Sequence, residues 1–146
     1  MLSCFLDSAI SIYAAGAEHP YRDPCAQIIA ALAAADHECV TSAEVLQEIL
    51  NVYVRRGEPL RAVAVISGLL GVLPTEPEAV FASDIIDAAT QVFPAVLSSR
   101  DRVHIAVMRR LGIDAIISAD HGFDLVPGIR RLDPLEFATW RAEAFS

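Results

Sequence analysis

Short apolar runs followed by an acidic residue recur along the chain. Ser3 to Asp7 is mostly apolar and ends in a carboxylate, and Ala115 to Ser118 is a second run with Asp120 just beyond it. Runs of this length and composition are typical of strands buried in a parallel sheet. Three further short strands are predicted at Glu38 to Thr41, at Val72–Leu73 and at Ile129 to Leu132.

A helical pattern follows the second predicted strand. Thr41-Ser42-Ala43-Glu44 has the spacing of a capping box, and the helix should run to about Arg56, where Gly57 stops it. Its apolar residues form one continuous arc, and Glu48 lies at the margin of that arc. Glu48 is therefore predicted to sit where the core meets a cleft.

Other helices are predicted from caps, prolines and glycines. They are a brief helix after Asp7, one capped by Asp23 and running from Pro24 to about Ala35, one from Glu58-Pro59 to about Leu70, one from Pro77 to Phe93, one from Arg100 to Leu111 with Ser98-Ser99 as cap and Gly112 as stop, and a terminal helix from Pro134. This alternation of strands and helices predicts an α/β fold with a mainly parallel sheet. Its cleft should lie at the carboxyl ends of the strands.

The composition bears on the number of domains, on the presence of an interface and on the location in the cell. A chain of 146 residues suits a single domain, residues 1–146. Counting Gly and leaving out Tyr gives about 57% apolar residues, above the usual ~45–50%, so some apolar surface should lie in an interface. The longest apolar stretch, Ala62 to Pro74, is too short for a membrane span, and MLSCFLDS has no basic leader, so we expect a cytoplasmic protein. The three cysteines lack metal-binding spacing and are expected to be small core residues.

The net charge of −8 disfavours a polyanionic partner without excluding one. An acidic metal site makes a metal-free protein look acidic, and all 11 basic residues are Arg, which suits bidentate phosphate contact. The Arg residues nearest in sequence to the candidate acids are Arg55, Arg56, Arg100 and Arg102. We expect phosphate contacts from this group.

Four acids stand where they can face the predicted cleft: Asp7, Glu48, Asp101 and Asp120. Each has an ordinary explanation alone: Asp101 can complement a helix dipole, Asp7 and Asp120 can form Asx turns, and Glu48 can simply be solvated. Gathered in one cleft, however, four carboxylates repel each other unless a cation neutralises them. All-oxygen ligation favours Mg²⁺ or Mn²⁺, ions that support phosphodiester hydrolysis.

The chain resembles the PIN domains, and within them the VapC-type toxins of bacterial toxin–antitoxin pairs. The resemblance rests on FLDSAISIY, VTSAEVLQEILNVYVRRG and SSRDRVHIAVMRRLGIDAIISADHGFDLVPGIRRLDP. It implies a three-layer sandwich, a metal-dependent endoribonuclease, and a metal site made of Asp7, Glu48, Asp101 and Asp120. It also implies an RNA substrate, a cognate antitoxin held in a groove, and a homodimer.

Several neighbours of the four acids are candidate accessory residues. Ser8 and Ser118 are expected to orient carboxylates, and Asp124 either assists at the edge of the site or caps the following turn. For His104 we expect a structural or substrate-contact role rather than that of a general base. His121 should lie near the cleft, and Arg102 is the candidate for substrate contact among the accessory residues.

Other function classes fit less well. Receiver and phosphatase-like domains place an Asp after their first strand but rely on a late lysine, and this chain has no lysine. A P-loop is excluded on the same ground, and there is no GxSxG elbow. The remaining alternatives are a catalytically silent PIN fold that acts as a binding module, and a PIN nuclease outside any toxin–antitoxin system.

Overall fold

Four short strands form a fully parallel sheet in the computed structural model, which describes residues 1–146. They are β1 (Ser3–Leu6), β2 (Glu38–Val40), β3 (Ala115–Ile117) and β4 (Arg130–Leu132), in the order β2-β1-β3-β4. Every pairing is parallel, with Phe5 of β1 opposite Val40 on one side and Ile116 on the other. The predicted α/β class with a mainly parallel sheet is confirmed.

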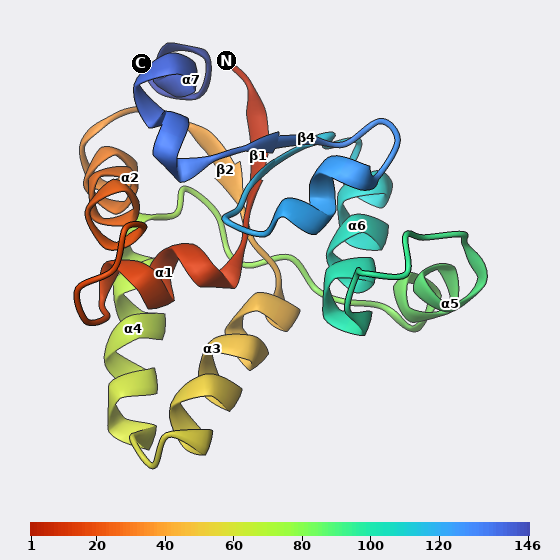
Figure 1. Cartoon of the computed structure of the whole chain (residues 1–146), viewed down its shortest axis with the longest axis horizontal. Helices are drawn as coiled ribbons and strands as arrows, with labels where there is room; N and C mark the ends of the chain where they lie inside the picture. The colour runs from red at the N-terminus through yellow and green to blue at the C-terminus, as the bar shows by residue number, and fades with distance from the viewer.

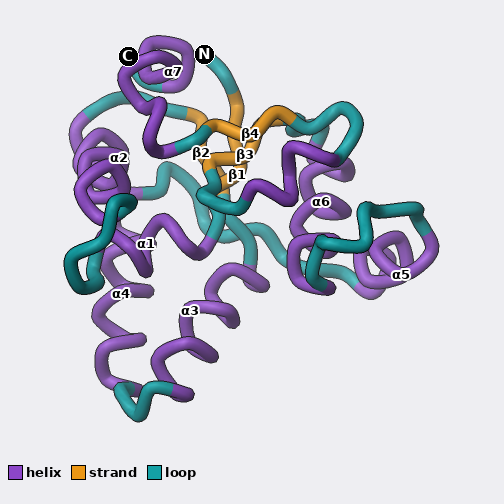
Figure 2. Tube along the Cα trace, in the orientation of Figure 1, coloured by secondary structure: helices purple, strands orange, loops and turns teal.

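Helices flank the sheet on both sides, which makes the three layers. Figure 1 shows α1, α2 and α4 on one side of the strands and α5 and α6 on the other, and Figure 2 shows how little of the chain is strand. The helices are α1 (Ser8–Ala14), α2 (Arg22–Ala34), α3 (Ala43–Arg55), α4 (Pro59–Val72), α5 (Ala82–Thr90), α6 (Ser99–Leu111) and α7 (Phe137–Ala144), with short 3-10 helices η1 (His121–Leu125) and η2 (Pro134–Glu136). None of them is long and apolar enough to cross a membrane.

The core is built around the sheet because its central strands are covered on both faces. Cys4, Phe5 and Leu6 of β1 are completely buried, as are all three residues of β3. All three cysteines are free and buried, as expected of small core residues. Cys4 lies directly opposite Cys39 of β2 in the sheet register.

The last residues of the chain close over the first ones. The Leu2 amide donates to the Glu143 carbonyl at 2.8 Å, and Ser146 exchanges backbone hydrogen bonds with Asp36. A bridge between His37 and Phe145 adds to this closure, and Figure 1 shows the two termini beside α7. The first and last segments of the sequence therefore share one end of the molecule.

The predicted start of α2 is wrong. The helix begins at Arg22 with Tyr21 in the cap position, so Asp23 and Pro24 lie inside its first turn. The Tyr21 ring stacks on Tyr13 with ring centroids 5.5 Å apart, and the Tyr21 amide donates to His19 Nδ1 at 3.1 Å. These contacts fix the turn before α2, and they outweigh the usual capping preference of Asp.

The predicted capping box at the start of α3 does not form. Thr41 Oγ1 donates to the Leu6 carbonyl at 2.9 Å, so this hydroxyl joins β2 to the end of β1. Ser42 takes the cap position without a side-chain cap bond, and Glu44 lies 3.8 Å from Arg100 Nε. A hydrogen bond across the sheet replaces the local one.

Two predictions between α4 and α6 are also wrong. There is no strand at Val72–Leu73, because α4 continues to Val72. The helix predicted from Pro77 to Phe93 is limited to α5, since Glu78 pairs with the chain around Ser42 instead. The Glu78 amide donates to the Thr41 carbonyl at 2.8 Å, and the Ala43 amide donates to Glu78 at 2.9 Å.

Candidate metal centre

The sheet has its switch point between β1 and β3. From β1 the chain crosses to β2 on one side, whereas β3 and β4 lie on the other, so the carboxyl ends of β1 and β3 border an open crevice. Asp7 follows β1 directly and Asp120 follows β3 after a short turn. The order of the strands therefore brings together two acids that are more than 110 residues apart in sequence.

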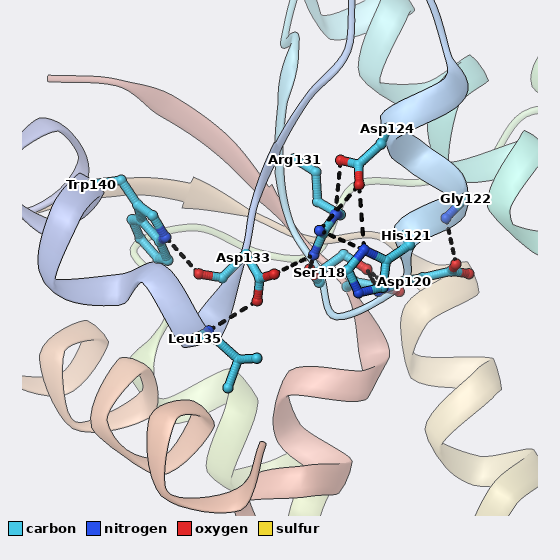
Figure 3. A network of polar contacts seen from close by, with 10 residues as sticks. Ser118, Asp120, His121, Gly122, Asp124, Arg131, Asp133, Leu135 and Trp140 are labelled. Atoms are coloured by element: carbon cyan, nitrogen blue, oxygen red, sulfur yellow. Dashed lines mark hydrogen bonds and ion pairs between the residues drawn. The ribbon is translucent and has the colours of Figure 1, made fainter. Parts of the chain in front are cut away.

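Ser118 connects these two acids. Its hydroxyl donates to Asp7 Oδ2 at 2.6 Å. The same hydroxyl accepts the amide of Asp120 at 3.0 Å (Figure 3). Asp7 also accepts the Ser8 amide at 2.8 Å as the cap of α1, and Asp120 accepts the Gly122 amide at 2.8 Å as the cap of η1. Both carboxylates are thus held at helix starts, where N–H groups favour negative charge.

Glu48 reaches the same crevice from α3. Ser8 Oγ donates to Glu48 Oε2 at 2.6 Å, and His104 Nε2 of α6 lies 2.6 Å from Glu48 Oε1 and 3.7 Å from Asp7 Oδ1. Burial opposes the charge on both groups, but their mutual attraction outweighs it, so the pKa of Glu48 is lowered and that of His104 is raised. His104 is completely buried and does not line the crevice, which agrees with the expected structural role and leaves it no surface for substrate contact.

Asp101 completes the group from the first turn of α6. Ser98 caps this helix by accepting the Asp101 amide at 3.2 Å, as predicted for the Ser98-Ser99 pair. Burial, the Asp7 carboxylate and a hydrogen bond with Asp120 together raise the pKa of Asp101 to about 7. Burial likewise raises the pKa of Asp7, so the metal-free site holds its negative charge with difficulty.

All four predicted acids line one cleft of about 540 Å³. The cleft is mostly polar, and Arg55, Arg100 and Asn51 lie along its wall. Asp7 and Asp101 are almost fully buried in its floor, so a cation there would be largely shielded from solvent. The structure therefore brings together the residues that the sequence singled out from four separate segments.

The donor set fits a hard divalent cation. One oxygen each of Asp7 and Glu48 and one nitrogen of His104 lie within 4.8 Å of one another, and Asp101 and Asp120 line the same cleft. Crowded carboxylates with raised pKa values are stabilised by a cation, and oxygen donors favour Mg²⁺ or Mn²⁺ over softer metals. These residues can therefore hold such an ion.

Some candidate accessory residues do not line the cleft. Asp124 pairs with Arg131, and His121 is largely exposed beside that pair. Arg102 donates to the Leu97 carbonyl and lies over the Phe93 ring, while Arg56 lies over the Tyr53 ring. Of the four arginines considered for phosphate contact, only Arg55 and Arg100 line the acidic cleft.

Two features of the site were not predicted from the sequence. The contact of His104 with Glu48 and Asp7 was missed, although His104 lies one helical turn after Asp101 and therefore on the same face of α6. The other feature is Arg131, a nearly buried cation of β4 that contacts the segment after β3. Its only sequence signal is a pair of arginines, Arg130 and Arg131, inside the strand predicted from Ile129 to Leu132.

A model of the PIN domain matches residues 4–129. The chain belongs to the PIN-domain family. Ribonuclease VapC13 of Mycobacterium tuberculosis is 37% identical to the PIN-domain chain over 132 residues, which cover 87% of this chain and 97% of the relative. The predicted family resemblance, VapC included, is thereby confirmed.

Solved structures share the fold. The M. tuberculosis toxin VapC20, described as cleaving the sarcin-ricin loop, superimposes with a TM-score of 0.67 at 24% identity, over 82% of this chain and 91% of that one. VapBC2 of Rickettsia felis, bound to a promoter DNA fragment, gives a TM-score of 0.65 at 13% identity, over 90% and 98%. At these identities the likeness concerns the fold, and it agrees with the expected sandwich.

Proposed function

We propose that the chain is the toxin of a toxin–antitoxin pair, an endoribonuclease that hydrolyses RNA phosphodiester bonds with Mg²⁺ or Mn²⁺. The observation that carries this proposal is the convergence of Asp7, Glu48, Asp101 and Asp120 on one open cleft of a PIN domain. The relatives at 37% identity, named VapC ribonucleases, support RNA as the substrate. Because all four acids are present, a catalytically silent PIN fold that acts as a binding module is the less well supported alternative.

Each group in the cleft has a defined task in this proposal. The four carboxylates would bind the cation, and Arg55 and Arg100 would bind RNA phosphates. Ser8 and Ser118 donate to the Glu48 and Asp7 carboxylates, and the Ser118 hydroxyl also accepts the Asp120 amide. The chemistry supplied by the bound ion is polarisation of the phosphoryl oxygen and a lower pKa for a coordinated water. His104 holds Glu48 and Asp7 in place from beneath.

The test is cleavage of a labelled RNA by purified protein. Wild-type protein should cut with Mg²⁺ or Mn²⁺ and stop in EDTA, and Asp7→Asn and Asp120→Asn should each lose at least about a hundredfold in rate while remaining folded. Asp87→Asn is the matched control, because this exposed acid of α5 lies outside the cleft. Undiminished cleavage in EDTA, or by Asp7→Asn, would overturn the metal mechanism.

An antitoxin is part of the same proposal. An apolar groove of about 400 Å³ lies between α1, α2 and α4, lined mainly by small apolar side chains such as Ala14, Ala64 and Val65. Such a groove accepts an amphipathic or extended partner segment. The Rickettsia felis VapBC2 structure, which shares the fold, supports the existence of an antitoxin partner.

Growth provides the corresponding experiment in cells. Induction of the wild-type chain without a cognate antitoxin should arrest growth, and Asp7→Asn should be harmless at equal expression. Mapping new 5′ RNA ends after induction would identify the cleaved RNA. A wild-type chain that cuts RNA in vitro and leaves growth unaffected would keep the nuclease and discard the toxin.

A further inference from the structure

Arg131 is a nearly buried cation one strand away from the acidic cleft. It is the middle residue of β4, opposite Ile116 of β3, and its side chain is only 6% exposed. Because side chains alternate along a strand, its neighbour Arg130 points to the other face. There Arg130 forms an exposed ion pair with Glu143 at 2.7 Å.

The Arg131 guanidinium contacts residues between β3 and β4 and also one residue after β4 (Figure 3). Its Nε and Nη2 form a bidentate pair with Asp124 at 3.0 and 3.1 Å, and Nη1 lies 3.1 Å from Asp133 Oδ2. Nη1 also donates to the Ser118 carbonyl at 3.0 Å, and Nη2 lies 3.0 Å from His121 Nδ1. Arg131 thus contacts both Ser118, at the start of the segment that contains Asp120, and Asp124, near the end of that segment.

The position of Ser118 turns this contact into a link to the cleft. The backbone of Ser118 is held by Arg131, while its hydroxyl bonds Asp7 and the Asp120 amide. If the Ser118 backbone shifts, the positions of both carboxylates change together. Outer groups that orient ligands in this way commonly change metal affinity by about 10–100-fold when they are removed.

Stability alone is a weak reason for this arrangement. Taking an arginine out of water costs several kcal/mol, and a buried ion pair is often replaced by packed apolar residues without loss of stability. Arg131 has two carboxylate partners and a carbonyl, which satisfy most of its donors. The network restrains geometry at the turn that carries the acids.

We propose that Arg131 is a positioning residue of the metal centre: by clamping Ser118 and η1 it holds Asp7 and Asp120 at the spacing that a divalent cation requires. The inference rests on the proposed function, since it assumes that these acids bind a metal. It assigns Arg131 no contact with RNA or with the ion. The effect should therefore appear in metal affinity.

The experiment compares Arg131→Met with Arg130→Met, which removes the neighbouring arginine from the same strand. Mn²⁺ binding to each metal-free protein is measured by calorimetry without RNA, at a temperature where circular dichroism shows both to be folded. Arg131→Met should bind Mn²⁺ about tenfold more weakly than wild type, and Arg130→Met should bind like wild type. In cleavage assays, saturating Mn²⁺ should restore the rate of Arg131→Met to within about threefold of wild type.

The outcomes separate the two proposals. Equal Mn²⁺ affinity in folded Arg131→Met and wild type overturns the positioning role and leaves the nuclease intact. A wild-type protein that neither binds Mn²⁺ nor cuts RNA overturns the proposed function, and this inference with it. If Arg131→Met does not fold, Arg131→Lys decides, because lysine keeps the positive charge but lacks the planar fork that contacts Ser118, Asp124 and Asp133 together. Weaker Mn²⁺ binding by Arg131→Lys supports the proposal, and unchanged binding overturns it.

Discussion

Asp101 has the most unusual ionisation in the cleft. Its pKa is raised to about 7 by burial, by the Asp7 carboxylate and by the hydrogen bond with Asp120. Near neutral pH Asp101 of the metal-free protein therefore keeps its proton in a fraction of molecules. A bound cation would replace that proton, so metal binding and proton release are coupled at this residue.

The stability of the metal-free protein should therefore depend on pH. The pKa of Asp101 is higher in the folded state than its ordinary value near 4, so its stabilising contribution is complete below about pH 4 and is lost as the pH rises through about 7. We expect the melting temperature in EDTA to fall between about pH 5 and pH 8. Asp101→Asn should flatten this dependence and Asp87→Asn should not; a melting temperature that rises over this range would contradict the assignment.

Arg55 and Arg100 are the two cations that line the acidic cleft. Reversing both to Glu should weaken RNA binding and lower the slope of log affinity against log salt by about 1.4, at about 0.7 for each lost phosphate contact with single-stranded RNA. Filter binding of catalytically inactive Asp7→Asn protein measures this without cleavage. Arg22→Glu combined with Arg141→Glu gives the same net charge away from the cleft, and an equal effect from that control would place the RNA elsewhere.

At the scale of elements, a single hydroxyl between β2 and α3 joins this connection to the end of β1. Thr41 is 1% exposed, and its Oγ1 donates to the Leu6 carbonyl. Thr41→Val should lower the free energy of unfolding by about 1 kcal/mol, the usual net value of one hydrogen bond. Urea unfolding measures the change. Thr90→Val removes an exposed hydroxyl bond within α5 and should cost less; equal losses would contradict the role assigned to Thr41.

The predicted elements that are confirmed and those that are wrong differ in how local their sequence signals are. The strand ends at Asp7 and Asp120 were predicted because an apolar run before an acid is a local signal. The capping box at Thr41 was wrong because the bonding partner of its hydroxyl, Leu6, is 35 residues away. Local propensity is overruled when a buried group finds a partner across the sheet.

The candidate site follows the same division. Asp7 and Asp120 converge because parallel strands end at one edge of the sheet, and Glu48 and Asp101 reach the same cleft from α3 and α6. The clamp by Arg131 could not be predicted, since its contacts with Ser118 and Asp124 depend on how η1 folds over β4. The helix predicted from Pro77 is shorter in the structure for a similar reason, because Glu78 pairs with a distant part of the chain near Ser42.

At the scale of the whole molecule, large apolar side chains remain exposed. On α3 and α4 they include Leu50, Val54, Leu60 and Val63, each at least 45% exposed. Extensive exposed apolar surface on a small domain favours association. We expect light scattering to report about twice 15.7 kDa for the purified chain; a strictly monomeric protein across the micromolar range would contradict the homodimer.

The strand order also bears on when a newly made chain becomes dangerous to its own cell. Asp7 is synthesised early, but β3, Ser118, which holds the Asp7 carboxylate, and the residues that close over Leu2 are synthesised more than 100 residues later. At ordinary translation speeds these 146 residues take roughly 7 to 30 seconds to synthesise. Throughout most of that time the ribosome carries a nascent polypeptide that lacks half of its cleft. A transcript cut or stalled before the codons of β3 would yield only inert fragments, so activity is restricted to molecules in which β3 and Asp120 have already been synthesised.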